Sequence, residues 1–93
     1  MRQYELTVIF PLEEDQYQAG REQVVTDLTA NGGEIEKTDE IGDKDLAYEI
    51  KKRKRGRYLL FTLKLEPAKI AVLDRIFKLN PNILKYLFVK VEE

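Results

Sequence analysis

The sequence contains no cysteine, histidine, serine or tryptophan. Without thiols and imidazoles it cannot form a disulfide framework or a zinc site of the usual Cys and His type. The common nucleophile and base pairs, which need Ser, Cys or His, are excluded as well. Catalysis by carboxylates or lysines stays open in principle, but no such pair stands out. We therefore expect a protein that is not an enzyme and has no metal and no cofactor.

Long apolar runs are also missing from the 93 residues. None approaches the roughly 18 to 20 residues that cross a membrane. The N-terminus alternates apolar and polar residues, whereas a signal peptide has a basic region followed by an apolar one. With 43% hydrophobic and 35% charged residues, the chain is expected to form one domain over residues 1–93, in the cytoplasm.

Four segments have the pattern of β-strands. Apolar and polar residues alternate from Arg2 to Phe10, and every odd residue from Tyr58 to Leu65 is apolar. A further strand is expected from Glu34 to about Lys51, with Gly42 interrupting it as a glycine does at a bulge. The last segment, about Ile83 to Val91, is apolar in both phases, so either of its faces can be the buried one.

Two segments between these strands have helical signals. Asp15 followed three residues later by Gln18 resembles a capping box, and Asn31-Gly32-Gly33 supplies the stop that a helix end favours. Pro67 suits the first turn of the second helix, and Asn80-Pro81-Asn82 ends it. The element order is then strand, helix, strand, strand, helix, strand. It predicts an α+β fold of the ferredoxin-like βαββαβ type, a four-stranded antiparallel sheet with two helices on one face.

Basic residues are concentrated between the second and third expected strands. Six of the sixteen lysines and arginines lie between Lys51 and Arg57, although the formal net charge of the chain is only -1. Such a local cationic field predicts a polyanionic partner. The simpler reading is a solvated hairpin tip that prevents edge-to-edge aggregation. Gly56 is expected to relax the backbone at the end of the turn.

One motif accompanies this basic segment, Gly42-x-Lys-Asp-Leu-Ala-Tyr-x-Ile-Lys51. It closely resembles the signature of the family of the sixth protein of the bacterial small ribosomal subunit. The likeness extends to the opening Met1-Arg2-x-Tyr4-Glu5, the Gly56-x-Tyr58 start of the third strand and the Lys-Val ending. Of the basic run, only Lys51 lies inside the signature.

The resemblance implies a structural constituent of the small ribosomal subunit, located in the ribosome and the cytoplasm. It implies binding to the central domain of small-subunit ribosomal RNA together with a basic partner, ribosomal protein eighteen of the small subunit. No membrane and no small-molecule substrate is expected. The alternative on the same fold is a self-associating regulatory or ligand-sensing domain that uses the uncovered sheet face.

Candidate site residues follow from charge and position. Cations can bind RNA phosphates by displacing condensed counterions, and acidic residues that would repel RNA can meet a cationic protein. The candidate RNA-binding residues are Arg2, Lys51, Lys52, Arg53, Lys54, Arg55, Arg57, Lys85 and Lys90. The candidate partner-binding residues are Asp39, Glu40, Asp43, Asp45, Tyr48 and Glu49. Alternation predicts that Leu46, Tyr48 and Ile50 belong more to the core than to a binding site, with the Tyr48 hydroxyl free to reach a polar partner.

Overall fold

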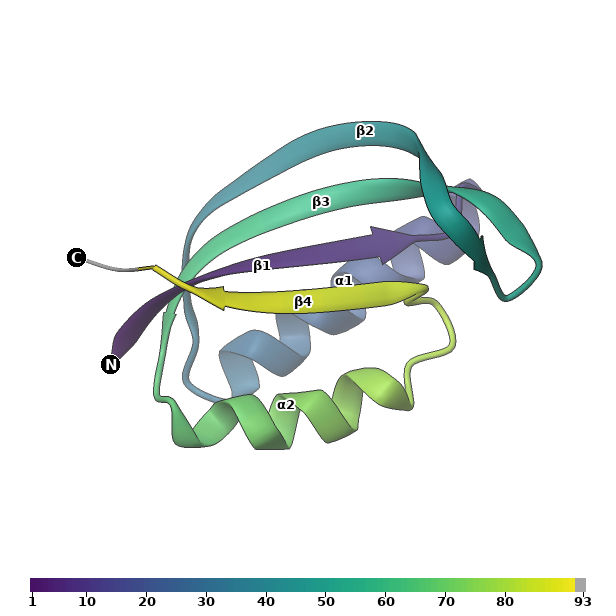
Figure 1. Ribbon diagram of the computed structural model, residues 1–93. Coiled ribbons are helices and arrows are strands. Elements are labelled where there is room, and N and C mark those ends of the chain that lie inside the picture. Colours follow the sequence, from purple (N-terminus) through teal and green to yellow (C-terminus); the bar gives the residue numbers. More distant parts are fainter. Residues whose placement is uncertain (92–93) are drawn as a thin grey trace.

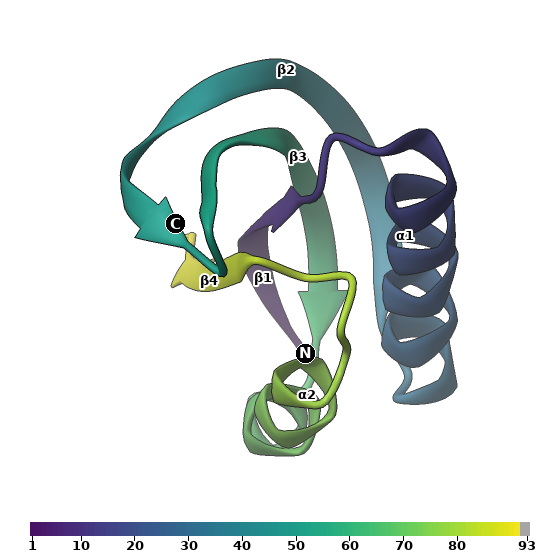
Figure 2. The ribbon, with the colours of Figure 1, turned by 90° about the vertical axis from the view of Figure 1, so that its right-hand side faces the viewer.

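The computed structural model describes residues 1–91 and contains four strands and two helices. In chain order these are β1 (Arg2–Phe10), α1 (Glu14–Ala30), β2 (Glu34–Ile50), β3 (Arg53–Leu65), α2 (Ala68–Lys78) and β4 (Lys85–Lys90). All neighbouring strands pair antiparallel in the order β2-β3-β1-β4. Both helices lie on one side of this sheet (Figures 1 and 2). The predicted ferredoxin-like fold is confirmed.

The core lies between the sheet and the helices, and alternation in β1 and β3 fills it as predicted. Leu6 and Val8 of β1 and Leu59 and Phe61 of β3 are completely buried. Burial of such side chains is the main favourable term in folding, about 1.5–3 kcal/mol for each. Partners across the two strands share a face, so Leu6 lies directly opposite Phe61.

The sequence does not tell which of the two apolar faces of β4 is buried. The contacts of the strand do. Tyr86 and Phe88 pack against the core, and their rings contact Phe77 of α2. Leu87 and Val89 face the open side of the sheet and are 58% and 48% exposed.

Two boundaries differ from the predictions. Helix α1 begins at Glu14, one residue before the expected cap Asp15, and its N-cap Glu13 forms no side-chain capping bond. Strand β3 begins at Arg53 and not at Tyr58, because the arginine-rich segment pairs with β2. Gly42 does interrupt β2 as expected, with φ of 111° and a register shift between Glu40 and Gly42. Neither helix of residues 1–91 has the length and apolarity needed to cross a membrane.

Candidate nucleic-acid interface

The β2–β3 hairpin closes with a two-residue turn, Lys51 and Lys52. Both residues have positive φ, 49° and 64°, and Ile50 pairs with Arg53 across the turn. Positive φ at both central residues is typical of the type I′ turn, in which Asn and Gly are more usual. The expectation that Gly56 ends the turn is wrong, because this residue is buried inside β3.

The end of the hairpin is held against the start of β4. The Lys51 Nζ donates a hydrogen bond of 3.1 Å to the carbonyl oxygen of Ile83. The Lys85 Nζ donates one of 2.9 Å to the Tyr48 hydroxyl and lies 5.1 Å from the centre of that ring. The bond to Tyr48 raises the pKa of Lys85. The arched hairpin therefore reaches the start of β4, as Figure 1 shows, through two of the lysines predicted to bind RNA.

Arg57 bonds to acidic residues of two other elements. Its Nε donates to Asp43 Oδ1 of β2 and its Nη1 to Glu14 Oε2 of α1, both at 2.9 Å. The guanidinium carbon also lies 4.6 Å from the ring centre of Tyr17. The bonds to Asp43 and Glu14 raise the pKa of Arg57. Its role in the described structure is therefore to connect β3 with β2 and α1.

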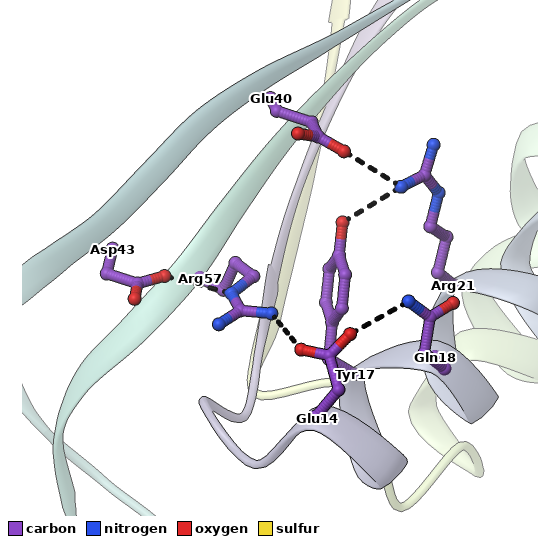
Figure 3. A network of polar contacts seen from close by, with 7 residues as sticks. All are labelled: Glu14, Tyr17, Gln18, Arg21, Glu40, Asp43 and Arg57. Carbon is purple, nitrogen blue, oxygen red and sulfur yellow. Dashed lines mark hydrogen bonds and ion pairs between the residues drawn. The ribbon is translucent and has the colours of Figure 1, made fainter.

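Arg21 of α1 extends the same network, which Figure 3 shows. Its Nη1 donates to the Tyr17 hydroxyl at 3.1 Å and to Glu40 Oε1 of β2 at 3.0 Å. The Gln18 amide donates to Glu14 at 2.9 Å, and this bond together with Arg57 lowers the pKa of Glu14. The network fixes β2 to α1 on both sides of the Gly42 bulge.

The other two arginines of the hairpin are paired as well. The Arg53 Nη1 lies 2.7 Å from Glu13 Oε1, and its Nη2 donates to Gln16 at 3.1 Å. The bond from Arg53 lowers the pKa of Glu13. Arg55 contacts Asp45 at 3.1 Å, but both side chains are largely exposed, so this pair contributes about 0–1 kcal/mol at most.

Lys52 and Lys54 differ from these arginines. Both are exposed, and within residues 1–91 neither has a carboxylate at ion-pair distance. A lysine at an exposed, unpaired position is free to neutralise an RNA phosphate and release the counterions condensed on the RNA. Within the basic run from Lys51 to Arg57, they are the two cations with neither an ion pair nor a side-chain hydrogen bond among residues 1–91.

The candidate RNA-binding residues do not form one patch. Lys85 lies beside the hairpin, whereas Arg2 and Lys90 lie at the opposite end of the sheet, where β1 begins and β4 ends (Figure 1). Tyr4 pairs with Lys90 in the register of that end. Both Arg2 and Lys90 are exposed.

The candidate partner-binding residues all lie on β2, at the edge of the sheet. Four of the carboxylates already contact cations of this chain: Asp39 with Lys37, Glu40 with Arg21, Asp43 with Arg57 and Asp45 with Arg55. Glu49 is exposed and has no ion pair within residues 1–91. A cationic protein would therefore meet an edge whose charge is partly neutralised.

The expectation that Leu46, Tyr48 and Ile50 belong to the core is wrong. Leu46 and Ile50 are only half-buried, and Tyr48 is 60% exposed. This part of β2 extends beyond the helices, so no second layer covers it (Figure 2). The predicted polar partner of the Tyr48 hydroxyl does exist, and it is Lys85.

Sequence reasoning missed the part that α1 plays. Glu14 and Gln18 are four residues apart, as are Tyr17 and Arg21, so each pair shares one face of a helix. That spacing was the available signal. It does not tell which strand lies opposite, because the bonds to β2 and β3 depend on tertiary structure. Among residues 1–91, no group of three or more acidic side chains could hold a metal ion.

Comparison with known proteins gives concordant results. The family model described as ribosomal protein S6 matches residues 3–90. The small ribosomal subunit protein bS6 of Treponema denticola is 47% identical over 93 residues, covering 100% of both chains. The bS6 protein of Treponema pallidum is 44% identical over 92 residues, covering 99% of each.

Two solved structures have the same fold. The 30S ribosomal protein S6 of Thermotoga maritima has a TM-score of 0.86 at 24% identity, covering 97% of this chain and 87% of that one. The C-terminal domain of the MgtC protein from Mycobacterium tuberculosis has a TM-score of 0.65 at 15% identity, covering 100% and 90%. At these identities the likeness shows the fold alone. Since proteins with different names share it, the fold does not choose the function.

Proposed function

Because the chain belongs to the ribosomal protein S6 family, we propose that it binds the central domain of small-subunit ribosomal RNA together with protein eighteen of that subunit. Family membership itself makes the chain a protein of the small ribosomal subunit, located in the ribosome and hence in the cytoplasm. The members are ribosomal proteins, which agrees with the expectation of a non-enzymatic chain. The binding of RNA and of a particular partner is the further step that needs support.

The observation that carries the RNA proposal is a pair of exposed lysines at the hairpin, Lys52 and Lys54, which have no ion pair within residues 1–91. Each phosphate that a lysine neutralises releases condensed counterions, which favours binding at low salt. The hairpin projects beyond the helices, so a bulky polyanion can approach it (Figure 2). Arg2 and Lys90 offer a second cationic contact at the far end of the sheet.

The remaining candidate cations have other partners in the free protein. Arg53 and Arg57 bond to carboxylates of α1, and Lys51 and Lys85 hold the end of the hairpin. Recruiting Arg57 to RNA would break two charge-assisted hydrogen bonds, one to Asp43 and one to Glu14. In the proposed interface, these four paired cations position Lys52 and Lys54.

For the basic partner protein, the proposal uses the edge strand β2. Among the candidate partner-binding carboxylates, Glu49 is exposed and has no ion pair within residues 1–91, and the neighbouring Tyr48 offers an exposed ring. Aromatic rings are enriched at protein interfaces, because they combine a large apolar area with a polar group. The self-associating regulatory domain, in contrast, is supported only by the shared fold and the uncovered sheet face.

Filter binding tests the proposal directly. The purified chain is mixed with central-domain RNA and protein eighteen of the small subunit, and retention is followed as salt increases. We expect a complex whose affinity falls steeply with salt, because phosphate contacts dominate it. Absence of a complex with the partner present would contradict the proposal.

The partner contact is tested with a charge reversal. Glu49→Lys should weaken binding to protein eighteen, whereas Glu22→Lys, the same change at an exposed position of α1, should not. Equal effects of the two substitutions would place the partner elsewhere on the chain.

A further inference from the structure

A hollow of about 260 Å³ lies on the face of the sheet that the helices leave open (Figure 2). In its first row, Ile9 of β1 lies between Tyr58 of β3 and Lys85 of β4, each directly opposite it. In the second row, two residues along, Thr7 of β1 lies opposite Leu87 of β4. Residues directly opposite one another share a face of the sheet, so one cation, one phenol ring and apolar surface meet here. We call this hollow the sheet pocket.

The side chains that line the sheet pocket are accessible from outside. Lys85 is exposed, Leu87 is 58% exposed, and Thr7 and Tyr58 are half-buried. On the other side of Tyr58, β2 has Gly42 in the paired position, which offers no side chain to cover the ring. A planar group that enters the pocket therefore meets an aromatic ring, an apolar side chain and an ammonium group.

The end of the β2–β3 hairpin lies beside the sheet pocket. Residues 46–49 of β2 have no partner in the register with β3, and this segment bends toward β4 (Figure 2). Lys85, which lines the pocket, donates the hydrogen bond of 2.9 Å to the Tyr48 hydroxyl. A lysine ammonium has three donors, so Lys85 keeps two for a ligand. The same hairpin end carries the exposed Lys52 and Lys54, so further cations are close to the pocket.

The charge and size of the sheet pocket select the ligand. None of the residues that line it is acidic, and Lys85 stands at its edge beside the cationic hairpin. A cationic protein segment would be repelled here, whereas an anionic chain is attracted. Unpaired RNA bases stack on aromatic side chains, and a lysine neutralises the phosphate next to the base. The volume is below the roughly 300–1,000 Å³ of sites for drug-sized ligands, which suits a single base.

We propose that the sheet pocket binds one unpaired base of an RNA strand, whose phosphates are neutralised by Lys85 and the hairpin lysines. The base stacks on the Tyr58 ring and contacts Leu87. The Thr7 hydroxyl, which can donate or accept, bonds to a polar atom of the base. This inference rests on the proposed RNA binding and adds the recognition of a base to it, because phosphate contacts alone carry no sequence information.

A titration of the ¹⁵N-labelled full chain with adenosine 5′-monophosphate tests the inference without ribosomal RNA and without the partner protein. We expect saturable NMR shifts of the Thr7 and Leu87 backbone amides. Ribose 5-phosphate has the same charge but no base, so it should bind about tenfold more weakly because stacking on an aromatic ring is lost. N-acetyl-leucine methylamide, which represents an apolar peptide, should bind more weakly than the nucleotide.

Three variants locate the bound nucleotide. Leu87→Asp places a carboxylate at an exposed position of the pocket and should weaken nucleotide binding severalfold by repulsion. Val89→Asp makes the same change on the same face of β4, outside the pocket, and should weaken it much less. Tyr58→Leu removes the ring without adding charge, so it should weaken binding of the nucleotide but not of ribose 5-phosphate.

Shifts that are absent, that are equally strong with ribose 5-phosphate, or that are lost equally in Leu87→Asp and Val89→Asp would overturn the proposal. So would tighter binding of the leucine probe, which would make the pocket a peptide site. The RNA proposal is tested separately by filter binding. An RNA complex retained on the filter, without any shift caused by the nucleotide, would contradict the base pocket alone.

Discussion

In the hairpin, Arg53, Arg55 and Arg57 each contact a carboxylate of this chain, whereas Lys52 and Lys54 contact none within the described residues 1–91. The difference follows from side-chain chemistry, because the planar guanidinium donates several directed bonds and suits a fixed network. The lysine ammonium is a compact, strongly hydrated charge on a flexible stem. At the scale of single residues, the positive charge therefore has two roles. In the arginines it stabilises the fold, and in the lysines we propose that it binds RNA.

Gly56 is the residue that allows the arginine-rich segment to be a strand. It is buried inside β3, and an added Cβ would overlap the Ile9 Cγ2 of β1. We expect Gly56→Ala to lower the free energy of unfolding by about 1–3 kcal/mol, as for an overpacked core. Denaturant unfolding measures this. The cost should shrink when Ile9→Ala is present as well, and an equal cost in both backgrounds would contradict the explanation.

At the scale of elements, Tyr86 connects β4 to α2. Its hydroxyl makes a short hydrogen bond to Asp74 Oδ1, and its ring lies 5.4 Å from that of Phe77. Burial, followed by the bond to Asp74, raises the pKa of Tyr86 to about 12. The folded state therefore favours the neutral phenol. This contribution to stability is complete below pH 10.0, the ordinary pKa, and is lost as the pH rises through about 12.

Tyr86→Phe tests this link. The bond from Tyr86, followed by that from Lys78, lowers the pKa of Asp74 in the folded protein. The carboxylate thus adds stability above its unfolded pKa, which is lost as the pH falls through the folded value. We expect Tyr86→Phe to raise the Asp74 pKa toward its ordinary value of 3.8, as followed by carboxyl ¹³C NMR. In the wild-type chain, the Tyr48 hydroxyl accepts from Lys85, so the control Tyr48→Phe should leave the Asp74 pKa unchanged. An unchanged Asp74 pKa in Tyr86→Phe would refute the link.

The elements also show where sequence patterns are sufficient. Alternation in β1 and on the odd face of β3 predicts both strands and their buried residues, because each has one apolar face. Alternation fails to predict burial where distant parts of the chain decide whether a strand face is covered. Tyr48 alternates like a core residue but extends past the helices, and the two apolar phases of β4 are distinguished only by contact with Phe77.

The candidate site shows the same limit. The motif from Gly42 to Lys51 predicts the family, and the basic run predicts the cationic hairpin. The pairing of Arg57 with Glu14 joins residues 43 positions apart, and no local pattern contains that information. Which of the hairpin cations are left free is therefore a result of the tertiary structure.

At the scale of the whole molecule, a formal net charge of -1 conceals a separation of surfaces. The hairpin and the far end of the sheet carry exposed cations, and β2 carries all of the acidic candidates for partner binding. We propose that this separation of charge lets the chain contact RNA and a cationic protein at different surfaces. We propose that RNA binds at Lys52 and Lys54.

The salt dependence of RNA binding tests that placement most directly. The logarithm of the binding constant is measured against the logarithm of salt concentration for the complex with protein eighteen of the small subunit. For Lys52→Gln with Lys54→Gln, the slope should become shallower by roughly one unit for each lost phosphate contact. The matched pair Lys69→Gln with Arg75→Gln removes the same charge from exposed positions of α2 and should keep the slope. An unchanged slope in the hairpin variant, or the same loss in both, would contradict the account.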